Sequence, residues 1–233
     1  TDFINKKDGG CWNGFITLSN GNVVTWGIEW ANDKGDSHIE VRDPQGNIIA
    51  SFSPKDPNGS DFYVQSVTDT GNGAFALTMH DTESFYGMSD FAQQIYTSQG
   101  ELKASYSYYN SNNLNDPMPY HYYSYYECPG TIVSLGNDKL ATNVLRVEDG
   151  SYNYSVRIMD SNLNVLRNVD LSDNQIVGIA SLGGGNLVVA QVNWRDLSKN
   201  YTVMDNNFNV AASFSSPSFY DFYTDDNGLS HHT

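Results

Sequence analysis

Leu18-Ser-Asn-Gly-Asn-Val-Val-Thr-Trp26 is the stretch that decides the fold, because related stretches recur along the chain. It joins an Asn-Gly turn to a run of β-branched residues, which is the pattern of a tight hairpin followed by a strand. The corresponding turns fall at Gly21, Gly73, Asp138 and Gly185, so they are 52, 65 and 47 residues apart. Spacings of this size are typical of repeated supersecondary units. The sequence therefore predicts four copies of one structural unit.

A second marker follows each hairpin and sets the register of the copies. It is an Asp that opens a turn with an Asn four residues later, and three copies carry it: Asp43 and Asn47, Asp160 and Asn164, Asp205 and Asn209. The second copy is degenerate and has Gln99-Gly100-Glu101 at this place. An Asp side chain can accept hydrogen bonds from the backbone of its own turn. In the first copy we expect strands at 15–18, 23–29, 38–42 and 47–52, which together make one antiparallel sheet.

Four such sheets in succession favour a β-propeller with about four four-stranded blades. The alternative is a β-sandwich, which would not require the Asp-to-Asn marker to recur in register. Leu18 to Trp26 together with Asp43-Pro-Gln-Gly-Asn47 resembles the propeller-like repeats of large secreted or surface-anchored bacterial proteins. We predict a single domain over 1–233, with repeats at about 11–53, 61–107, 129–171 and 176–215 and a surplus C-terminal strand within 217–233.

The charge balance argues against two classes of partner. The chain has 12 Lys and Arg against 27 Asp and Glu, a formal net charge of −15, which repels nucleic-acid phosphates and anionic lipids. No apolar run reaches the roughly 18 residues of a membrane span. We therefore expect neither nucleic-acid binding nor membrane insertion. The abundance of Asn, Ser, Thr and Tyr favours an extracellular or cell-surface protein.

The two cysteines occupy matching positions in alternate copies. Cys11 and Cys128 each lie ten residues before the turn of their copy, at Gly21 and Asp138. In a closed four-bladed ring the first and third copies would face each other across the axis. A Cys11–Cys128 disulfide is then one expectation, and two unpaired thiols are the other.

Three sequons predict glycosylation, at Asn58, Asn153 and Asn200. Two of them, Asn153 and Asn200, stand at the entrance to the third strand of their copies. Their matched placement is the suggestive feature, because a chain this rich in Asn, Ser and Thr contains sequons by chance.

Two segments do not fit the repeats, and both offer aromatic surface. A tyrosine-rich insertion lengthens the second copy, and it suits sugar stacking or a protein interface, unless its alternate tyrosines simply line a strand. The chain also continues beyond the fourth copy into one strand too many, which either latches onto the first blade or is donated to a neighbour. The expected interface residues are Tyr108, Tyr109, Tyr120, Tyr122, Tyr123, Phe219, Phe222 and Tyr223.

No catalytic motif is present in the sequence. It lacks a Gly-x-Ser-x-Gly elbow, a phosphate-binding Gly loop and a His-Glu-x-x-His pair, so we expect no catalytic residues, cofactor or metal. The favoured function is that of a non-enzymatic extracellular structural or adhesive protein, which self-associates into a fibre or filament through its terminal strand and tyrosine-rich segment. The alternatives are a glycan-binding, lectin-like propeller and, less favoured, a propeller glycosidase or lyase.

Overall fold

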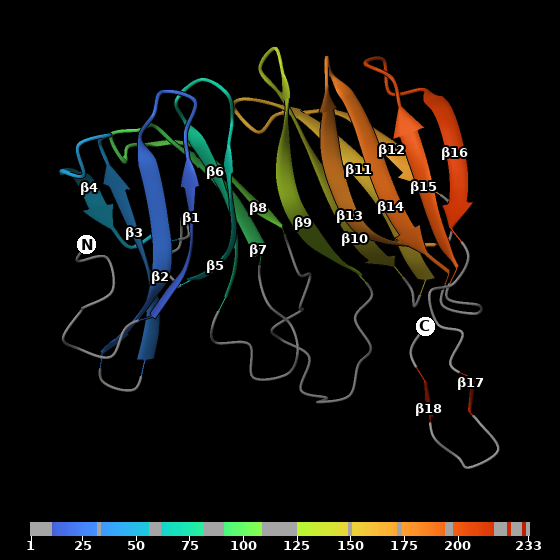
Figure 1. Ribbon diagram of the computed structural model, residues 1–233, viewed down its shortest axis with the longest axis horizontal. Helices are drawn as coiled ribbons and strands as arrows, with labels where there is room; N and C mark the ends of the chain where they lie inside the picture. The colour runs from blue at the N-terminus through green and yellow to red at the C-terminus, as the bar shows by residue number, and fades with distance from the viewer. Residues whose placement is uncertain are drawn as a thin grey trace.

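The chain is an all-β protein in every part that the structure describes (Figure 1). The structure is a computed structural model, and it describes residues 11–31, 34–55, 62–81, 91–108, 125–148, 151–171, 174–193, 198–216, 223–224 and 230–231. Within these residues there is no helix, and hence none that could span a membrane. The predicted fold class, with four four-stranded antiparallel blades, is confirmed.

Each blade is an antiparallel meander of four consecutive strands. The strands of blades 1 and 2 are β1 (Cys11–Thr17), β2 (Val23–Ala31), β3 (Lys34–Arg42), β4 (Ile48–Phe52), β5 (Phe62–Asp69), β6 (Phe75–Asp81), β7 (Phe91–Tyr96) and β8 (Leu102–Tyr108). Those of blades 3 and 4 are β9 (Tyr125–Gly136), β10 (Lys139–Glu148), β11 (Ser151–Asp160), β12 (Val165–Leu171), β13 (Gln175–Gly183), β14 (Asn186–Val192), β15 (Lys199–Met204) and β16 (Val210–Ser216).

The blades stand side by side in a row, with the first strand of each blade against the first strand of the next. Figure 1 shows blade 1 at one end of the long axis and blade 4 at the other. In the described part of the chain, therefore, the row does not close into the four-bladed ring that the sequence suggested. The row instead has two ends, and each end presents one face of a sheet.

An apolar core lies between each pair of neighbouring blades. One face of a blade, its leading face, turns towards the next blade, and the opposite face, its trailing face, turns towards the preceding blade. Val24 and Val41 of the leading face of blade 1 pack with Phe75 and Leu77 of the trailing face of blade 2. The junctions of blades 2 and 3 and of blades 3 and 4 are built in the same way. Sheet-on-sheet packing is therefore the repeating tertiary contact.

The recurring Asp-to-Asn marker is a side-chain-capped turn. Oδ1 of Asp43 accepts hydrogen bonds from the backbone N–H groups of Gln45 (3.0 Å) and Asn47 (2.8 Å), and Oδ2 accepts one from the Asn47 amide (2.8 Å). Asp160 and Asp205 make the same three bonds in their turns. In blade 2 the hydroxyl of Thr97 takes over the role of the carboxylate. A hydroxyl at this place explains why the second copy lacks the Asp.

The third residue after the capping residue adopts a positive φ in every blade. It is Gly46 in blade 1 and Gly100 in blade 2, but Leu163 (φ 63°) and Phe208 (φ 62°) in blades 3 and 4. A non-glycine residue at such an angle carries backbone strain. Leu163 and Phe208 are both buried in the core shared with the preceding blade, and this burial offsets the strain. The turn thus also ties each blade to the one before it.

The surplus strand does not join any of the four blades. Strand β17 (Tyr223–Thr224) pairs with β18 (Ser230–His231), and the two form a separate small hairpin beyond blade 4 (Figure 1). Of the two arrangements considered for this strand, the latch onto the first blade is not formed by the residues that the structure describes here.

Candidate functional site

The joint between blades 2 and 3 contains the most elaborate polar cluster of the described residues. Arg157 on β11 is buried, and its guanidinium donates to Glu127 Oε1 at 2.9 Å and to Asn168 Oδ1 at 3.1 Å. It also lies over the rings of Tyr106 and Tyr108, 5.6 and 5.3 Å from their centroids. The Glu127 carboxylate and these rings keep the pKa of Arg157 above its usual value although burial opposes this. The arginine is thus a permanently charged bridge between two sheets.

A second buried network adjoins this ion pair. The Tyr108 hydroxyl donates to Gln93 Oε1 at 2.6 Å, and the Gln93 amide donates to Thr142 Oγ1 at 3.1 Å and to the carbonyl of Gly130 at 3.3 Å. Burial raises the pKa of Tyr108. These polar atoms satisfy one another, and the side chains of Tyr108, Gln93 and Thr142 are buried. The network is therefore suited to fixing the blades in register and not to chemistry.

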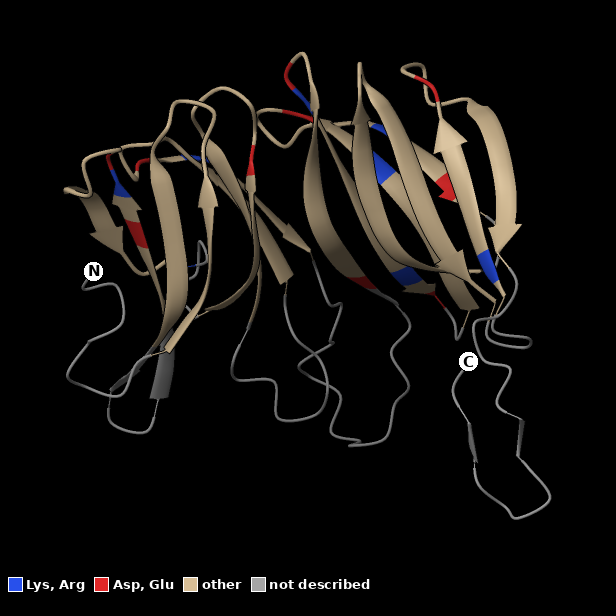
Figure 2. Ribbon diagram, in the orientation of Figure 1, with Lys and Arg blue, Asp and Glu red and all other residues tan. Residues whose placement is uncertain are grey.

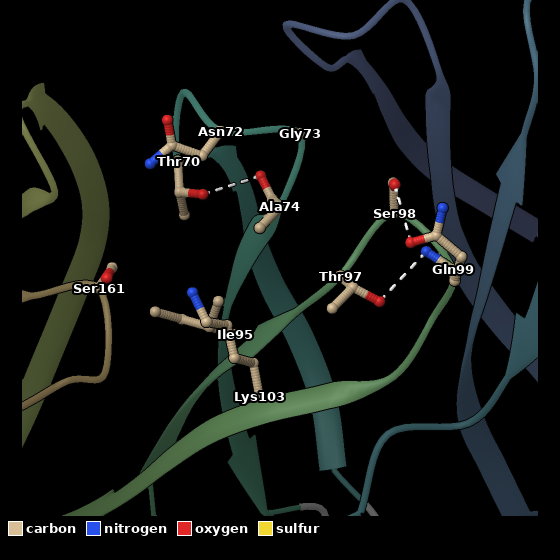
Figure 3. Close-up of a pocket in the computed structure, with 10 residues that line it drawn as sticks. All are labelled: Thr70, Asn72, Gly73, Ala74, Ile95, Thr97, Ser98, Gln99, Lys103 and Ser161. Atoms are coloured by element: carbon tan, nitrogen blue, oxygen red, sulfur yellow. Dashed lines mark hydrogen bonds between the residues drawn. The ribbon is translucent and has the colours of Figure 1, made fainter.

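A hollow of about 250 Å³ lies near the turns of blade 2 (Figure 3). Its lining is about equally polar and apolar, with Thr70, Asn72, Thr97, Ser98, Gln99, Lys103 and Ser161 beside Gly73, Ala74 and Ile95. The Thr97 hydroxyl is already engaged in capping the turn, and the Thr70 hydroxyl donates to the carbonyl of Ala74. None of the described lining residues is aromatic or acidic. The hollow therefore has neither a sugar-stacking platform nor a pair of carboxylates.

No metal centre emerges among the residues that the structure describes. They contain no group of three or more His, Cys, Asp and Glu side chains placed to hold an ion. One hydroxyl does lie beside a base in these residues: the Ser51 hydroxyl is 3.0 Å from His38 Nε2, and Glu40 Oε1 is 3.7 Å from the same nitrogen. Because the hydroxyl and the carboxylate approach one ring nitrogen, Glu40 does not orient His38 through its other nitrogen, as the carboxylate of a serine–histidine–aspartate triad does.

The end face of blade 4 is mainly apolar, with Lys199 at its border, and its exposed apolar side chains include Leu182 and Phe214. On this face Ala180, Val188, Val203 and Ala212 form one row across the sheet, and Ala190, Tyr201 and Phe214 form the next. Tyr201 and Phe214 stack with their ring centroids 5.1 Å apart. Phe214 and Leu182 are each 55% exposed. Figure 2 shows no charged residue on β16, which borders this face.

The end face of blade 1 combines an exposed aromatic ring with paired charges. Phe15 is 72% exposed, and it is in register with Thr25, Glu40 and Ser51 across the sheet. Arg42 on the same face donates to Glu40 Oε2 at 2.7 Å and to the carbonyl of Gly46 at 3.0 Å. The two ends of the row therefore differ in chemistry: the centre of the blade 4 face is apolar, whereas the blade 1 face joins an exposed ring to the Arg42–Glu40 ion pair.

The two cysteines are free thiols in this structure, so the disulfide expected between them is not formed. Cys11 is exposed on β1, while Cys128 is half-buried on β9. In a row of blades the first strand of blade 2 lies between β1 and β9, whereas the predicted bridge required a closed ring. Burial raises the pKa of the Cys128 thiol to about 11.

The structure separates the predicted surface residues into three groups. Tyr108 was expected at an interface with another molecule, but it is buried between blades 2 and 3 because its ring packs on Arg157. Asn153 is exposed on β11, and Asn200 on β15 accepts a hydrogen bond from Ser215. The remaining predicted residues lie where the structure does not describe side chains: Asn58, Tyr109, Tyr120, Tyr122, Tyr123, Phe219, Phe222 and Tyr223.

Sequence reasoning did not find the Arg157 joint or the two end faces. A lone arginine in a strand has no local signature. Phe15 and Leu182 could have been found by aligning the copies, because each lies at a fixed distance from the hairpin turn, but their exposure depends on the blades not closing.

Comparisons with known proteins add no family. No protein-family model matches the sequence, and no curated protein matches it. Among solved structures the chain is similar to a subtype N10 neuraminidase-like protein of A/little yellow-shouldered bat/Guatemala/060/2010. The identity is 9% and the TM-score 0.49, with 91% of this chain and 60% of that one covered. A eukaryotic initiation factor is similar over 89% of this chain and 67% of that one, with an identity of 10% and a TM-score of 0.28. The chain thus spans three fifths of the length of the neuraminidase-like protein. No activity is taken from either similarity.

Proposed function

We propose that the protein is a self-associating structural protein of the cell exterior, a subunit whose copies join into a larger assembly. The observation that carries the proposal is the end face of blade 4, where an apolar sheet surface with a stacked aromatic pair is open to solvent. Contiguous apolar patches on soluble proteins mark interaction surfaces, because leaving them in water is unfavourable. Self-association covers such a surface without requiring a second gene product.

The extracellular placement rests on composition and on the likeness of the repeats to those of surface proteins. The net charge of −15 keeps the remaining surface soluble and limits random aggregation. Association is thereby disfavoured on surfaces with unpaired acidic groups. This combination suits a structural or adhesive subunit that must remain soluble until it meets another copy.

The glycan-binding alternative has less support in the described residues. A lectin-like propeller would place aromatic rings beside polar groups in an accessible hollow. The hollow beside the turns of blade 2 is lined by polar and aliphatic groups, and Tyr106 and Tyr108 are engaged with Arg157. For the enzyme alternative the described residues offer the Ser51–His38 pair, with 3.0 Å between the hydroxyl and Nε2, but the Glu40 carboxylate approaches that same nitrogen and not the other one.

Sedimentation of the purified chain over a wide concentration range tests the proposal. We expect the average mass to rise with concentration, and electron microscopy of concentrated samples to show assemblies larger than the monomer. Because each copy is strongly anionic, added salt should promote association by screening the repulsion between copies. A chain that stays monomeric throughout, with and without salt, would overturn the proposed function.

A further inference from the structure

The register of the repeats points to the partner of each end face. We propose that the leading face of blade 4 binds the trailing face of blade 1 of a second copy, so that blades continue head to tail from one copy to the next. This inference rests on the proposed self-association and specifies its surfaces. It identifies the occupant of the apolar end face as a second copy of this chain.

The leading face of blade 4 repeats the positions that are buried at every internal junction. The residue three positions before each hairpin turn is Leu18, Thr70, Leu135 and then Leu182. Leu18 and Leu135 are each 2% exposed in the cores between their blades, whereas Leu182 is 55% exposed. Phe214 likewise matches Phe52, Tyr106 and Val169, all of which pack against an interblade core. Blade 4 thus carries the side chains of a junction, and no described blade packs on them.

The trailing face of blade 1 carries the other half of the same junction. The residue six positions before each turn is Phe15, Val67, Ile132 and Ile179. Val67 is 8% and Ile132 1% exposed, and Ile179 packs against the core between blades 3 and 4. Phe15 alone faces solvent, because no described blade precedes it. In the same row Thr25 and Glu40 are each 6% exposed, so Phe15 is the side chain that this face offers to a neighbour. By register, the two end faces are the two complementary halves of one repeating contact.

The internal junctions also predict which side chains meet. Phe52 on the leading face of blade 1 packs on Tyr96 on the trailing face of blade 2, with ring centroids 4.7 Å apart. The equivalents at a junction between copies are Phe214 and Arg42. An arginine over an aromatic ring is a favourable contact, and the joint of blades 2 and 3 already uses one in Arg157 on Tyr106.

The turn of blade 1 leaves space for this contact. Leu163 and Phe208 project from the turns of blades 3 and 4 into the preceding core, and a side chain on Gly100 would meet Ala50 and Phe52 of blade 1. At the equivalent Gly46 no atom lies within 4 Å of where a side chain would begin. The turn of blade 1 therefore projects no side chain into the space beside the trailing face.

Two single-face variants test the inference. Phe15→Asp blocks the trailing face of blade 1, and Phe214→Asp blocks the leading face of blade 4. Both side chains are exposed, so the variants should fold, which an unchanged far-ultraviolet circular dichroism spectrum checks. Ile48→Asp and Val210→Asp are the matched controls, because these residues open the fourth strands and an aliphatic residue at this position is exposed in every blade. The readout is mass by sedimentation, for each variant alone and for an equimolar mixture.

Each variant alone should associate at least about 30-fold more weakly than the wild type, since an aspartate would be buried at the centre of the contact. The mixture should form one-to-one dimers that grow no further, because each such pair has a single intact junction. The controls should associate like the wild type.

Three results would overturn the head-to-tail contact while leaving self-association in place. One is undiminished association of either variant alone, which indicates a contact through other surfaces or between two like faces. The second is a mixture that stays monomeric. The third is a control that loses association as fully as the variants. A wild-type chain that remains monomeric would reject the proposed function itself, and a different protein or a further blade would then be the occupant of the end face.

Discussion

Replacing Phe208 tests how a strained turn is offset by packing between blades. Its φ of 62° disfavours any residue with a side chain, while its ring is buried against blade 3. Phe208→Ala removes the ring and keeps the strain, so we expect a loss of about 3 to 5 kcal/mol of unfolding free energy. Phe208→Gly also removes the ring but relieves about 1 to 2 kcal/mol of strain. Glycine gives the unfolded chain more conformational entropy, which offsets about half of this gain in unfolding free energy.

The expected order is therefore unusual, with the glycine variant more stable than the alanine variant by about 0.5 to 1 kcal/mol. Phe75 provides the control, because it is equally apolar and fully buried but lies in the extended strand β6. There the order should reverse, with Phe75→Gly less stable than Phe75→Ala by about 0.5 to 1 kcal/mol. Urea denaturation followed by intrinsic fluorescence measures all four variants. Equal stability of the two Phe208 variants would refute the account of the turn.

Three further outcomes are expected. The hydrogen bond from the Asn164 side chain, together with backbone hydrogen bonds, lowers the pKa of Asp160 below its usual 3.8, so its contribution to stability is complete above that pH and is lost as the pH falls through the lower folded value. The urea midpoint of the wild type should therefore exceed that of Asp160→Ala at neutral pH, and the difference should shrink as the pH is lowered. A thiol reagent at pH 8 should modify Cys11 quickly and Cys128 slowly, because the raised pKa of Cys128 leaves little thiolate. Arg157→Met should cost about 3 to 5 kcal/mol by urea denaturation, since it leaves the Glu127 carboxylate without its cation, and adding Glu127→Gln should recover part of the loss.

The sequence was sufficient for the parts of the fold that depend on neighbours along the chain. Asp43 and Asn47 identify a turn because the capping bonds join residues at most four apart. The strands that flank such a turn follow from their alternating pattern, so the four sheets were predictable. The first strand of blade 1 begins earlier than expected, at Cys11, because a bulge between Trp12 and Gly14 interrupts the alternation.

The sequence was insufficient where the outcome depends on how sheets lie against one another. The angle between neighbouring blades is the sum of many side-chain contacts in three cores, and no local pattern encodes whether four blades close. The Cys11–Cys128 bridge was inferred from closure and is therefore absent together with it. Tyr108 was assigned to the surface because it borders an insertion, whereas its burial depends on Arg157, which lies 49 residues away in the next blade.

Exposed apolar residues occur both at the start of the fourth strands and on the two end faces, and the difference between these two sets explains why association should be directional. Ile48, Leu102, Val165 and Val210 open the fourth strands and are exposed in all four blades, so their exposure says nothing about an assembly. Phe15 and Leu182 differ, because their equivalents are buried wherever a neighbouring blade is present. The acidic charge on the chain opposes contact through most surfaces, but the centre of the blade 4 end face has no charge to oppose it. The two end faces differ in chemistry, since one presents Phe214 and the other Arg42. A contact between two unlike faces is therefore more favourable than a contact between two copies of the same face. A heterologous contact of this kind has no built-in limit, so it leads to extended assemblies unless the geometry closes a ring.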